Sequence, residues 1–406
     1  MIATSTTTIE LEEIGLPAQP APAEHPDSRV GREWGIDKRS EPNRLGESEH
    51  RDPSPTPAAR APEKWNEPRR NLYRLGAAFW CFFVMGANDA VYGALIPYLE
   101  SYYNLTYLVV SLVFLSPFVG YVSSAILNNH LHHKLGQRGI GILCGSCHLA
   151  AYVIIAAHPP YVALVFAFTL AGFGNGVADA AWNAWVGNLA NSSELLGFLH
   201  ALYGAGGVVS PLIATTLVTR ANLEWYSVYY IMIGFAAVEL ISLALAFWDS
   251  NGATYRRESS ESWEGSESGL CNTLFRMPAA RVTWVAALFL LCYVGVEVAL
   301  GGWIVTFMLR ERHAGAFASG MSAVGFWLGI TVGRAVLGFV TPRLGVKMST
   351  ASYMGAVMAL ELIFWLVPQF YVSAVAVSLQ GFFLGPMFPN AVLHNHPVFE
   401  SFNPSS

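Results

Sequence analysis

Two adjacent polar residues, Asn88 and Asp89, lie in the middle of the apolar run F-F-V-M-G-A-N-D-A-V-Y-G-A-L-I-P. The surrounding segment, about 73–99, is long enough to cross a bilayer, which takes about 20 apolar residues. A carboxylate at that depth is costly unless it faces a polar cavity, finds a partner or takes up a proton. Membrane proteins keep such groups mainly where ions, protons or polar solutes pass, so the pair predicts a transporter.

A second carboxylate, Asp179, lies in another apolar segment. Asn175, Asp179 and Asn183 recur four residues apart, so they form one polar stripe on a helix, with Trp182 beside it. Burial disfavours the charged form of a carboxylate, so Asp89 and Asp179 are both predicted to exchange protons. The alternative for each is an interhelical hydrogen bond with no role in transport.

Composition indicates the setting of these groups. Hydrophobic residues make up 53% of the 406 residues and charged residues only 13%, which is too few to cover a soluble surface of this size. The net charge of −5 is modest and predicts no nucleic-acid partner. Five cysteines without disulfide-like spacing give no sign of a secreted scaffold. We therefore expect an all-α polytopic membrane protein.

The apolar spans divide the chain into two unequal groups of helices. Ten spans lie at about 73–99, 107–130, 140–157, 161–187, 195–219, 226–248, 282–309, 317–341, 348–367 and 370–393. Residues 1–70 are Pro-, Glu-, Ser- and Arg-rich and are predicted to be a disordered cytoplasmic tail. A cytoplasmic polar linker at 250–281 separates a six-helix bundle at 71–249 from four helices at 282–393, and 394–406 form a second tail.

Basic residues near the ends of the spans predict a cytoplasmic N-terminus, because cytoplasmic loops carry an excess of Lys and Arg. The residues expected on that side are Lys64, Arg69, Arg70, Arg74, Lys134, Arg138, Arg343 and Lys347. Arg310 and Arg312 would lie on the opposite side, so they count against this orientation.

The two groups of helices repeat at a constant offset of 209 positions. The shift places Gly86 on Gly295, Ala90 on Ala299, Gly93 on Gly302, Gly120 on Gly329, Lys134-Leu135-Gly136 on Arg343-Leu344-Gly345, Gly172 on Gly381 and Gly176 on Gly385. Such parallel repeats of six helices are an architecture of secondary transporters. The repeat predicts two more helices near 404–428 and 435–457, beyond Ser406, so a chain cut after its tenth helix is expected.

Several motifs resemble those of the major facilitator superfamily. The paired basic turns H-K-L-G-Q-R-G and P-R-L-G-V-K follow the second and eighth spans, within the six-plus-six arrangement. The N-D pair, G-F-G-N-G-V-A-D-A-A-W-N in the fourth span and Y-V-G-V-E-V-A-L-G-G-W in the seventh resemble the proton-coupled L-fucose permease branch, especially its fungal members. The resemblance spans about 73–393.

That branch uses acidic residues of the first and fourth helices to carry the proton and touch the sugar. The resemblance therefore implies these roles for Asp89, next to Asn88, and for Asp179, where the family residue is Glu. Other polar and aromatic side chains in the spans are candidates for binding the solute. The complete predicted set is Asn88, Tyr92, Asn175, Trp182, Asn183, His200, Glu297 and Trp303.

Several of these candidates have plainer alternatives. His200 is a candidate for relaying protons or binding solute, but a buried histidine is more often only hydrogen-bonded. Trp303 is as suited to anchoring at the membrane interface as to stacking on a sugar. The resemblance implies a cytoplasmic gate of basic residues, to which we assign Lys134, Arg138, Arg334 and Arg343. Glu239 and Glu361 are further intramembrane acids with no assigned role.

Two other motif matches carry little weight. Cys144-Gly-Ser-Cys147-His148 fits the haem-attachment pattern C-x-x-C-H, but it lies inside an apolar span. His130, His132 and His133 resemble one box of a di-iron desaturase, which needs several such boxes. A loop facing phosphate head groups explains them better.

These observations predict a secondary active transporter that moves a small polar solute, in the first place a sugar, by proton-coupled alternating access. We expect a monomer in the plasma membrane, with solute, protons and lipid as its partners and no cofactor or metal. The alternative is a non-transporting membrane sensor or an inactive truncated product, which the missing helices favour. The sequence offers no nucleophile, metal set or nucleotide-binding loop, so an enzyme is not expected.

Overall fold

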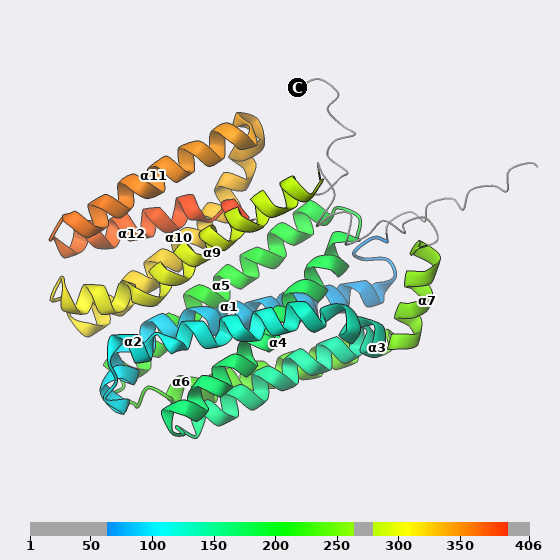
Figure 1. Cartoon of the computed structure of the whole chain (residues 1–406), viewed down its shortest axis with the longest axis horizontal. Helices are drawn as coiled ribbons and strands as arrows, with labels where there is room; N and C mark the ends of the chain where they lie inside the picture. Colours follow the sequence, from blue (N-terminus) through cyan, green and yellow to red (C-terminus); the bar gives the residue numbers. More distant parts are fainter. Residues whose placement is uncertain (1–62, 264–278, 389–406) are drawn as a thin grey trace, which may run out of the picture. The chain divides into compact units, whose positions relative to one another are not determined.

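The computed structural model describes residues 63–263 and 279–388, and their regular structure is helical (Figure 1). One isolated bridge between Lys64 and Glu67 is the nearest approach to a strand in these ranges. Eight of the helices described are long and apolar enough to cross a membrane, and one shorter apolar helix follows them. The predicted all-α membrane fold is therefore confirmed.

The helices follow the predicted spans closely. The first group comprises α1 (Arg69–Tyr103), α2 (Tyr107–Val110), α3 (Leu112–Ala156), α4 (Tyr161–Gly187), α5 (Ser192–Thr219) and α6 (Ser227–Ala246). The second comprises α9 (Ala279–Arg310), α10 (Ala316–Leu344), α11 (Val346–Leu366) and α12 (Phe370–Leu384). Helices α2 and α3 together cover the two spans predicted at 107–130 and 140–157, and α3 is kinked at Gly136. Divided there, the eight long helices supply nine of the ten predicted spans, and α12 supplies the tenth.

A helix not named by the sequence analysis, α7 (Gly252–Trp263), occupies the start of the polar linker. Its sequence has no apolar stripe, so only the residue that caps it could have indicated a helix. Asn251 Oδ1 accepts hydrogen bonds from the backbone N–H groups of Ala253 and Thr254, both at 3.0 Å. Arg256 ties α7 to α3 by donating to His133 O at 2.6 Å. The rest of the linker and most of both tails (1–62, 264–278 and 389–406) lie outside the described residues, so the domain boundaries stay predictions.

The offset of 209 positions also holds in the backbone. Gly136 and Gly345 both have positive φ angles, 67° and 83°, a conformation that glycine adopts without the steric cost of a side chain. Asn104 and His313, which follow α1 and α9, are related by the same offset and have φ angles of 53° and 50°. The two groups of helices therefore repeat at the turns as well as in the sequence.

Close helix packing repeats in the same way. A Cβ at Gly120 would overlap Thr169 O on α4, and a Cβ at Gly329 would overlap Ser378 O on α12. Thr169 and Ser378 are again 209 positions apart. Glycine at these places lets the helix backbones touch, which is how membrane helices pack without large side chains between them.

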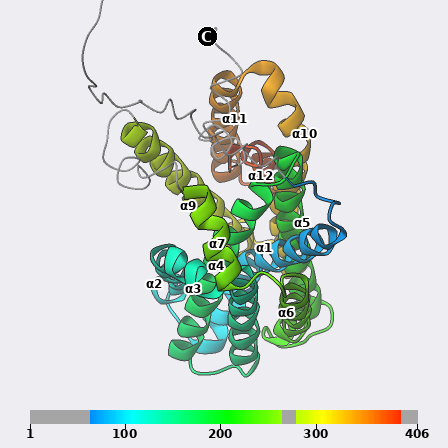
Figure 2. The same ribbon diagram turned by 90° about the vertical axis from the view of Figure 1, so that its right-hand side faces the viewer.

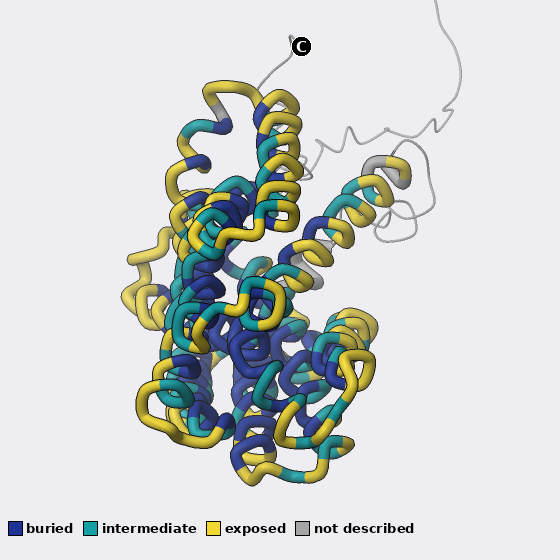
Figure 3. The backbone as a smooth tube through the Cα atoms, turned by 90° about the vertical axis from the view of Figure 1, so that its left-hand side faces the viewer, coloured by how far each residue is buried: buried dark blue, intermediate teal, exposed yellow. Residues whose placement is uncertain are grey.

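Helices α1 and α5 of the first group pack against α9 and α10 of the second, and α5 lies between α1 and α10 (Figure 2). At the crossing of α1 and α9, a Cβ at Gly93 would overlap the backbone of Gly301. Buried residues gather where helices face one another and exposed residues on the outer faces (Figure 3). Large apolar side chains such as Ile126, Phe166 and Phe339 are exposed there, as lipid-facing residues are.

Candidate functional site

The Asp89 carboxylate accepts hydrogen bonds from four neutral donors on four helices. Asn88 on α1 and Asn175 on α4 donate through their amide nitrogens to Oδ1, at 3.0 and 2.7 Å. Tyr203 on α5 and Tyr121 on α3 donate through their hydroxyls to Oδ2, at 2.9 and 3.2 Å. In 63–263 and 279–388, Asp89 forms no ion pair. The carboxylate is therefore held by hydrogen bonds from neutral groups and not by a direct ion pair.

The second predicted proton carrier, Asp179, belongs to a hydrogen-bonded chain along α4 and α5. Asn183 donates through Nδ2 to Asp179 Oδ1 at 2.8 Å, within the predicted polar stripe. The Oδ1 atom of the same amide lies 3.1 Å from His200 Nε2. The structure therefore brings three of the predicted residues together, with His200 at the end nearest the second group of helices.

Glu297 and Arg334, which were assigned to different roles, form one buried ion pair. Arg334 NH2 lies 3.3 Å from Glu297 Oε1, and the two side chains are only 6% and 8% exposed. Arg334 also donates to His200 O at 3.5 Å. The assignment of Arg334 to a cytoplasmic gate stays a prediction, but its partners connect it to the predicted solute-binding residues.

Tyr203 contacts both Asp89 and Arg334, the partner of Glu297. Its hydroxyl donates to Asp89, and the Arg334 guanidinium carbon lies 5.5 Å from the centre of its ring. Tyr203 was not identified from the sequence, although it lies three residues after His200 and so on the same face of a helix. Tyr121, the fourth donor to Asp89, had no signal beyond its place in an apolar span.

The other predicted solute-binding residues lie in aromatic surroundings. Tyr92 is buried and meets Phe168 edge to face at 4.9 Å between ring centres. Trp182 is fully buried and stacks on Phe247 at 4.6 Å. Their roles stay predictions, and their packing is also what a core residue would show.

Trp303 lies near the C-terminal end of α9. Its ring centre is 6.0 Å from those of Tyr107 and Phe114, both of the first group of helices. The structure therefore places Trp303 in an aromatic contact between the two groups. Its predicted part in binding a solute stays a prediction.

The three other predicted gating residues lie near the Gly136 and Gly345 turns. Arg138 donates to Trp248 O at 3.3 Å and its guanidinium carbon lies 4.2 Å from the Trp248 ring, so it connects α3 to the end of α6. Lys134 and Arg343 are exposed. The gating role of all three stays a prediction.

Arg310 and Arg312, the residues that opposed the predicted orientation, both have specific partners. Arg310 forms an ion pair with Glu100 at 2.7 Å and donates to the Tyr107 hydroxyl. Arg312 donates to the carbonyl oxygens of Phe364 and Trp365, which end α11. Both cations serve contacts between helices, so they are weak evidence about orientation.

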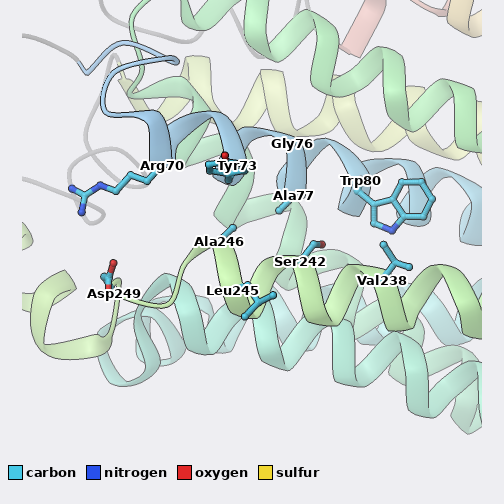
Figure 4. Close-up of a pocket in the computed structure, with 10 residues that line it drawn as sticks. All are labelled: Arg70, Tyr73, Gly76, Ala77, Trp80, Val238, Ser242, Leu245, Ala246 and Asp249. Carbon is cyan, nitrogen blue, oxygen red and sulfur yellow. The ribbon is translucent and has the colours of Figure 1, made fainter.

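A surface pocket between α1 and α6 lies apart from these residues (Figure 4). Arg70 and Trp80 line it from α1, and Asp249 lines it just beyond the end of α6. It contains none of the predicted site residues. We therefore build the candidate site from the Asp89 and Glu297 networks and not from this pocket.

Comparison with known proteins places the chain among membrane carriers. The sequence pattern of the Major Facilitator Superfamily matches residues 78–394. Bypass of stop codon protein 6 of Saccharomyces cerevisiae is 30% identical over 344 residues, which cover 76% of this chain and 67% of the yeast protein. The Glucose/mannose transporter GlcP of Bacillus subtilis is 23% identical over 319 residues, which cover 78% of this chain and 76% of GlcP.

Two solved structures share the fold. The Major Facilitator Superfamily transporter FucP, in its outward conformation, superposes with a TM-score of 0.57 at 16% identity, covering 78% of this chain and 82% of FucP. The peptide transporter POT in complex with sulfate superposes with a TM-score of 0.52 at 12% identity, covering 79% of this chain and 87% of POT. At these identities the likeness concerns the fold alone.

Proposed function

Since the chain belongs to the major facilitator superfamily, whose members carry small solutes across membranes, we propose that it is a proton-coupled transporter of a sugar-like solute. Asp89 carries the coupling proton, with Asp179 as a second carrier. The solute binds between the two groups of helices, near Asp89 and the Glu297–Arg334 pair. The protein is an integral multi-pass membrane protein, and we place it in the plasma membrane with a cytoplasmic N-terminus.

The observation that carries the proposal is the set of neutral donors around Asp89. A carboxylate paired with a buried cation leaves that cation uncompensated when it takes up a proton, which costs several kcal/mol. Asp89 has no directly paired cation among the described residues. Its protonation therefore weakens hydrogen bonds from neutral donors but leaves no paired cation uncompensated. This is the arrangement expected of a group that gains and loses a proton in each cycle.

Protonation of Asp89 is coupled to solute binding through Tyr203. A proton on Oδ2 makes that oxygen a donor and releases the Tyr203 hydroxyl from its present bond at 2.9 Å. The Tyr203 ring lies beside Arg334, and its freed hydroxyl can turn toward a solute hydroxyl. Proton binding therefore prepares the solute site, and solute binding in turn favours the protonated carboxylate.

Contacts between the two groups of helices support an alternating-access cycle. At the ends of α1 and α9, Glu100 pairs with Arg310, and at the ends of α5 and α10, Arg220 lies 4.3 Å over the Phe317 ring. If the N-terminus is cytoplasmic, these ends face outward, so opening the solute site to the outside requires these two contacts to separate. Rocking of the two groups about Gly93 and Gly301 would open it.

A sugar-like solute is favoured by the site and by one relative. Amides and carboxylates near Asp89 offer both donors and acceptors, which hydroxyl-rich solutes require. GlcP, a relative at 23% identity, is named as a glucose/mannose transporter. Each proton entering along a potential of about 100 mV supplies roughly 2.3 kcal/mol toward accumulating such a solute.

The test is to express the chain in transport-deficient cells and to record external pH while hexoses are added, beginning with D-glucose and D-mannose. We expect one hexose to make the medium more alkaline, and expect the response to disappear in Asp89→Asn. Glu361→Gln is the matched control, because Glu361 is also an intramembrane acid, hydrogen-bonded by Gln380 at 2.8 Å. Hexose uptake without any pH change would reject proton coupling.

A further inference from the structure

A buried carboxylate–histidine pair lies in the first group of helices, in addition to the site described above. His148 Nδ1 on α3 is 2.9 and 3.1 Å from the two oxygens of Glu239 on α6, and both side chains are fully buried. Cys81 on α1 donates to the same carboxylate at 3.0 Å. From the sequence, Glu239 had no assigned role, and His148 was only part of a rejected haem motif.

The other ring nitrogen of His148 faces the helix that carries Asn175. A Cβ at Gly174 would lie 2.9 Å from His148 Nε2, so this edge of the imidazole is against α4. His148 Nε2 and Asn175 Oδ1 are both buried without a hydrogen-bond partner in the described residues. A protonated Nε2 of His148 would be a donor and Oδ1 of Asn175 is an acceptor, so each atom can satisfy the other.

We propose that His148 and Glu239 are positioning residues for Asp89: an imidazolium at His148, balanced by Glu239, holds the Asn175 amide so that its nitrogen donates to Asp89. The inference deepens the proposed role of Asp89 and rests on that proposal. Asn175 already donates through Nδ2 to Asp89 Oδ1 at 2.7 Å. Its Oδ1 then points away from Asp89 and needs a donor, which the Nε2–H of a doubly protonated His148 supplies.

The amide makes the two protonation sites depend on each other. While Asp89 is ionised, it needs the NH₂ group of Asn175, so Oδ1 faces His148 and favours a proton on Nε2. When Nε2 loses its proton, it becomes an acceptor and favours the NH₂ group instead. The amide oxygen then faces Asp89, which suits a protonated carboxyl. A protonated His148 thus favours an ionised Asp89, and a neutral His148 favours a protonated Asp89.

Among the described residues, His148 is the only basic group in the cluster of titratable side chains around the His148–Glu239 pair. These groups are Cys81, Asp89 and Tyr92 from α1, Cys144, Cys147 and Tyr152 from α3, and Tyr229 from α6. The Tyr152 ring stacks on the imidazole at 5.9 Å. Loss of the imidazolium therefore removes the positive charge of this cluster together with the proposed Nε2–H donor.

An infrared titration of the purified protein tests this without any solute. The carboxyl absorption of Asp89 is the band that disappears in Asp89→Asn, and its titration midpoint is measured in each variant. Glu239→Gln removes the charge that balances the imidazolium, and His148→Leu removes the donor. Both make the ionised form of Asp89 less favourable, so both should move the midpoint upward by about one pH unit, a tenfold gain in proton affinity.

Three further variants separate positioning from a structural role. Glu239→Asp keeps the carboxylate and should restore the wild-type midpoint. The double variant Glu239→Gln/His148→Leu should shift it no further than His148→Leu alone, because the two act as one unit. Glu361→Gln, in the second group of helices, should leave it unchanged. If Glu239→Gln does not fold, His148→Leu should still give the upward shift, because it leaves Asn175, the direct donor to Asp89, in place.

Two results would overturn the inference. One is an Asp89 band whose midpoint is the same in wild type, Glu239→Gln and His148→Leu. The other is a spectrum that Asp89→Asn does not alter, which would leave His148 no titration to adjust. Because no solute is added, a shifted midpoint in a protein that moves no hexose would support this inference and reject the transport proposal.

Discussion

Each group of helices carries a carboxylate at nearly the same place in the repeat, Asp89 in the first and Glu297 in the second, but the partners of the two carboxylates differ. Glu297 lies 209 positions after Asn88, the neighbour of Asp89. Asp89 is held by four neutral donors, whereas Glu297 is paired with the buried Arg334. Glu297 would leave that cation unpaired on taking up a proton, whereas Asp89 would not. This difference is why we propose that proton exchange takes place in the first group of helices.

The scaffold around these carboxylates is far more symmetrical than the carboxylates themselves. The Gly120–Thr169 and Gly329–Ser378 contacts, and the positive φ angles of Gly136 and Gly345, repeat at the same offset. The helices of the two groups thus pack alike while their buried polar groups differ. Under the proposed function, such a repeat lets one half exchange the proton while both halves keep the same backbone packing.

The largest expected effect comes from breaking the buried ion pair. Arg334→Gln leaves Glu297 without its cation, and we expect a loss of about 3–5 kcal/mol in the free energy of unfolding. The double variant Glu297→Gln/Arg334→Gln removes both charges and should recover most of that loss. Thermal unfolding of the purified proteins in one detergent measures both. A double variant as unstable as Arg334→Gln would contradict the pairing.

A smaller effect is expected from removing single donors to Asp89. Tyr203→Phe deletes a hydrogen bond to a charged group, worth about 1.5–3 kcal/mol, so the ionised carboxylate becomes less favourable. The pH at which proton-driven uptake falls by half should then move upward by about one unit or more. Tyr121→Phe removes the longer bond, at 3.2 Å, and should move it less. An unchanged pH profile in both variants would contradict the role of neutral donors.

The smallest effect is expected at the exposed pair between the two groups. Arg310 is 43% exposed and Glu100 13% exposed, so this pair should contribute at most about 1 kcal/mol. Glu100→Gln should lower the unfolding temperature by no more than a few degrees, and less still at high salt. A loss as large as that of Arg334→Gln would contradict the description of Glu100 and Arg310 as a weak, exposed pair.

Much of the fold could be predicted from the sequence because apolar length and glycine spacing are local signals. The spans and the 209-residue repeat follow from them, whereas the structure joins the second and third spans through a kink at Gly136. The two carboxylates stood out because charged residues are rare in such spans. Helix α7 was missed, since a Ser/Glu-rich segment carries no apolar periodicity.

The partners of the site residues could not be predicted in the same way. Whether Tyr121 and Tyr203 reach Asp89 depends on the rotation of α3 and α5 about their axes, which an apolar sequence does not specify. For the same reason Glu297 and Arg334 were assigned to separate roles. Pairing of distant residues is a property of helix packing, and it becomes visible only in the structure.

Counterflow and accumulation of radiolabelled D-glucose in proteoliposomes, or of whichever hexose alkalinises the medium, test the central claim most directly. With an imposed pH gradient, we expect Asp89→Asn to abolish accumulation while keeping exchange of solute across the membrane. The Glu297→Gln/Arg334→Gln variant should still accumulate solute, even if more weakly. Accumulation by Asp89→Asn, or loss of proton-driven accumulation only in the double variant, would contradict the assignment of the coupling proton to Asp89.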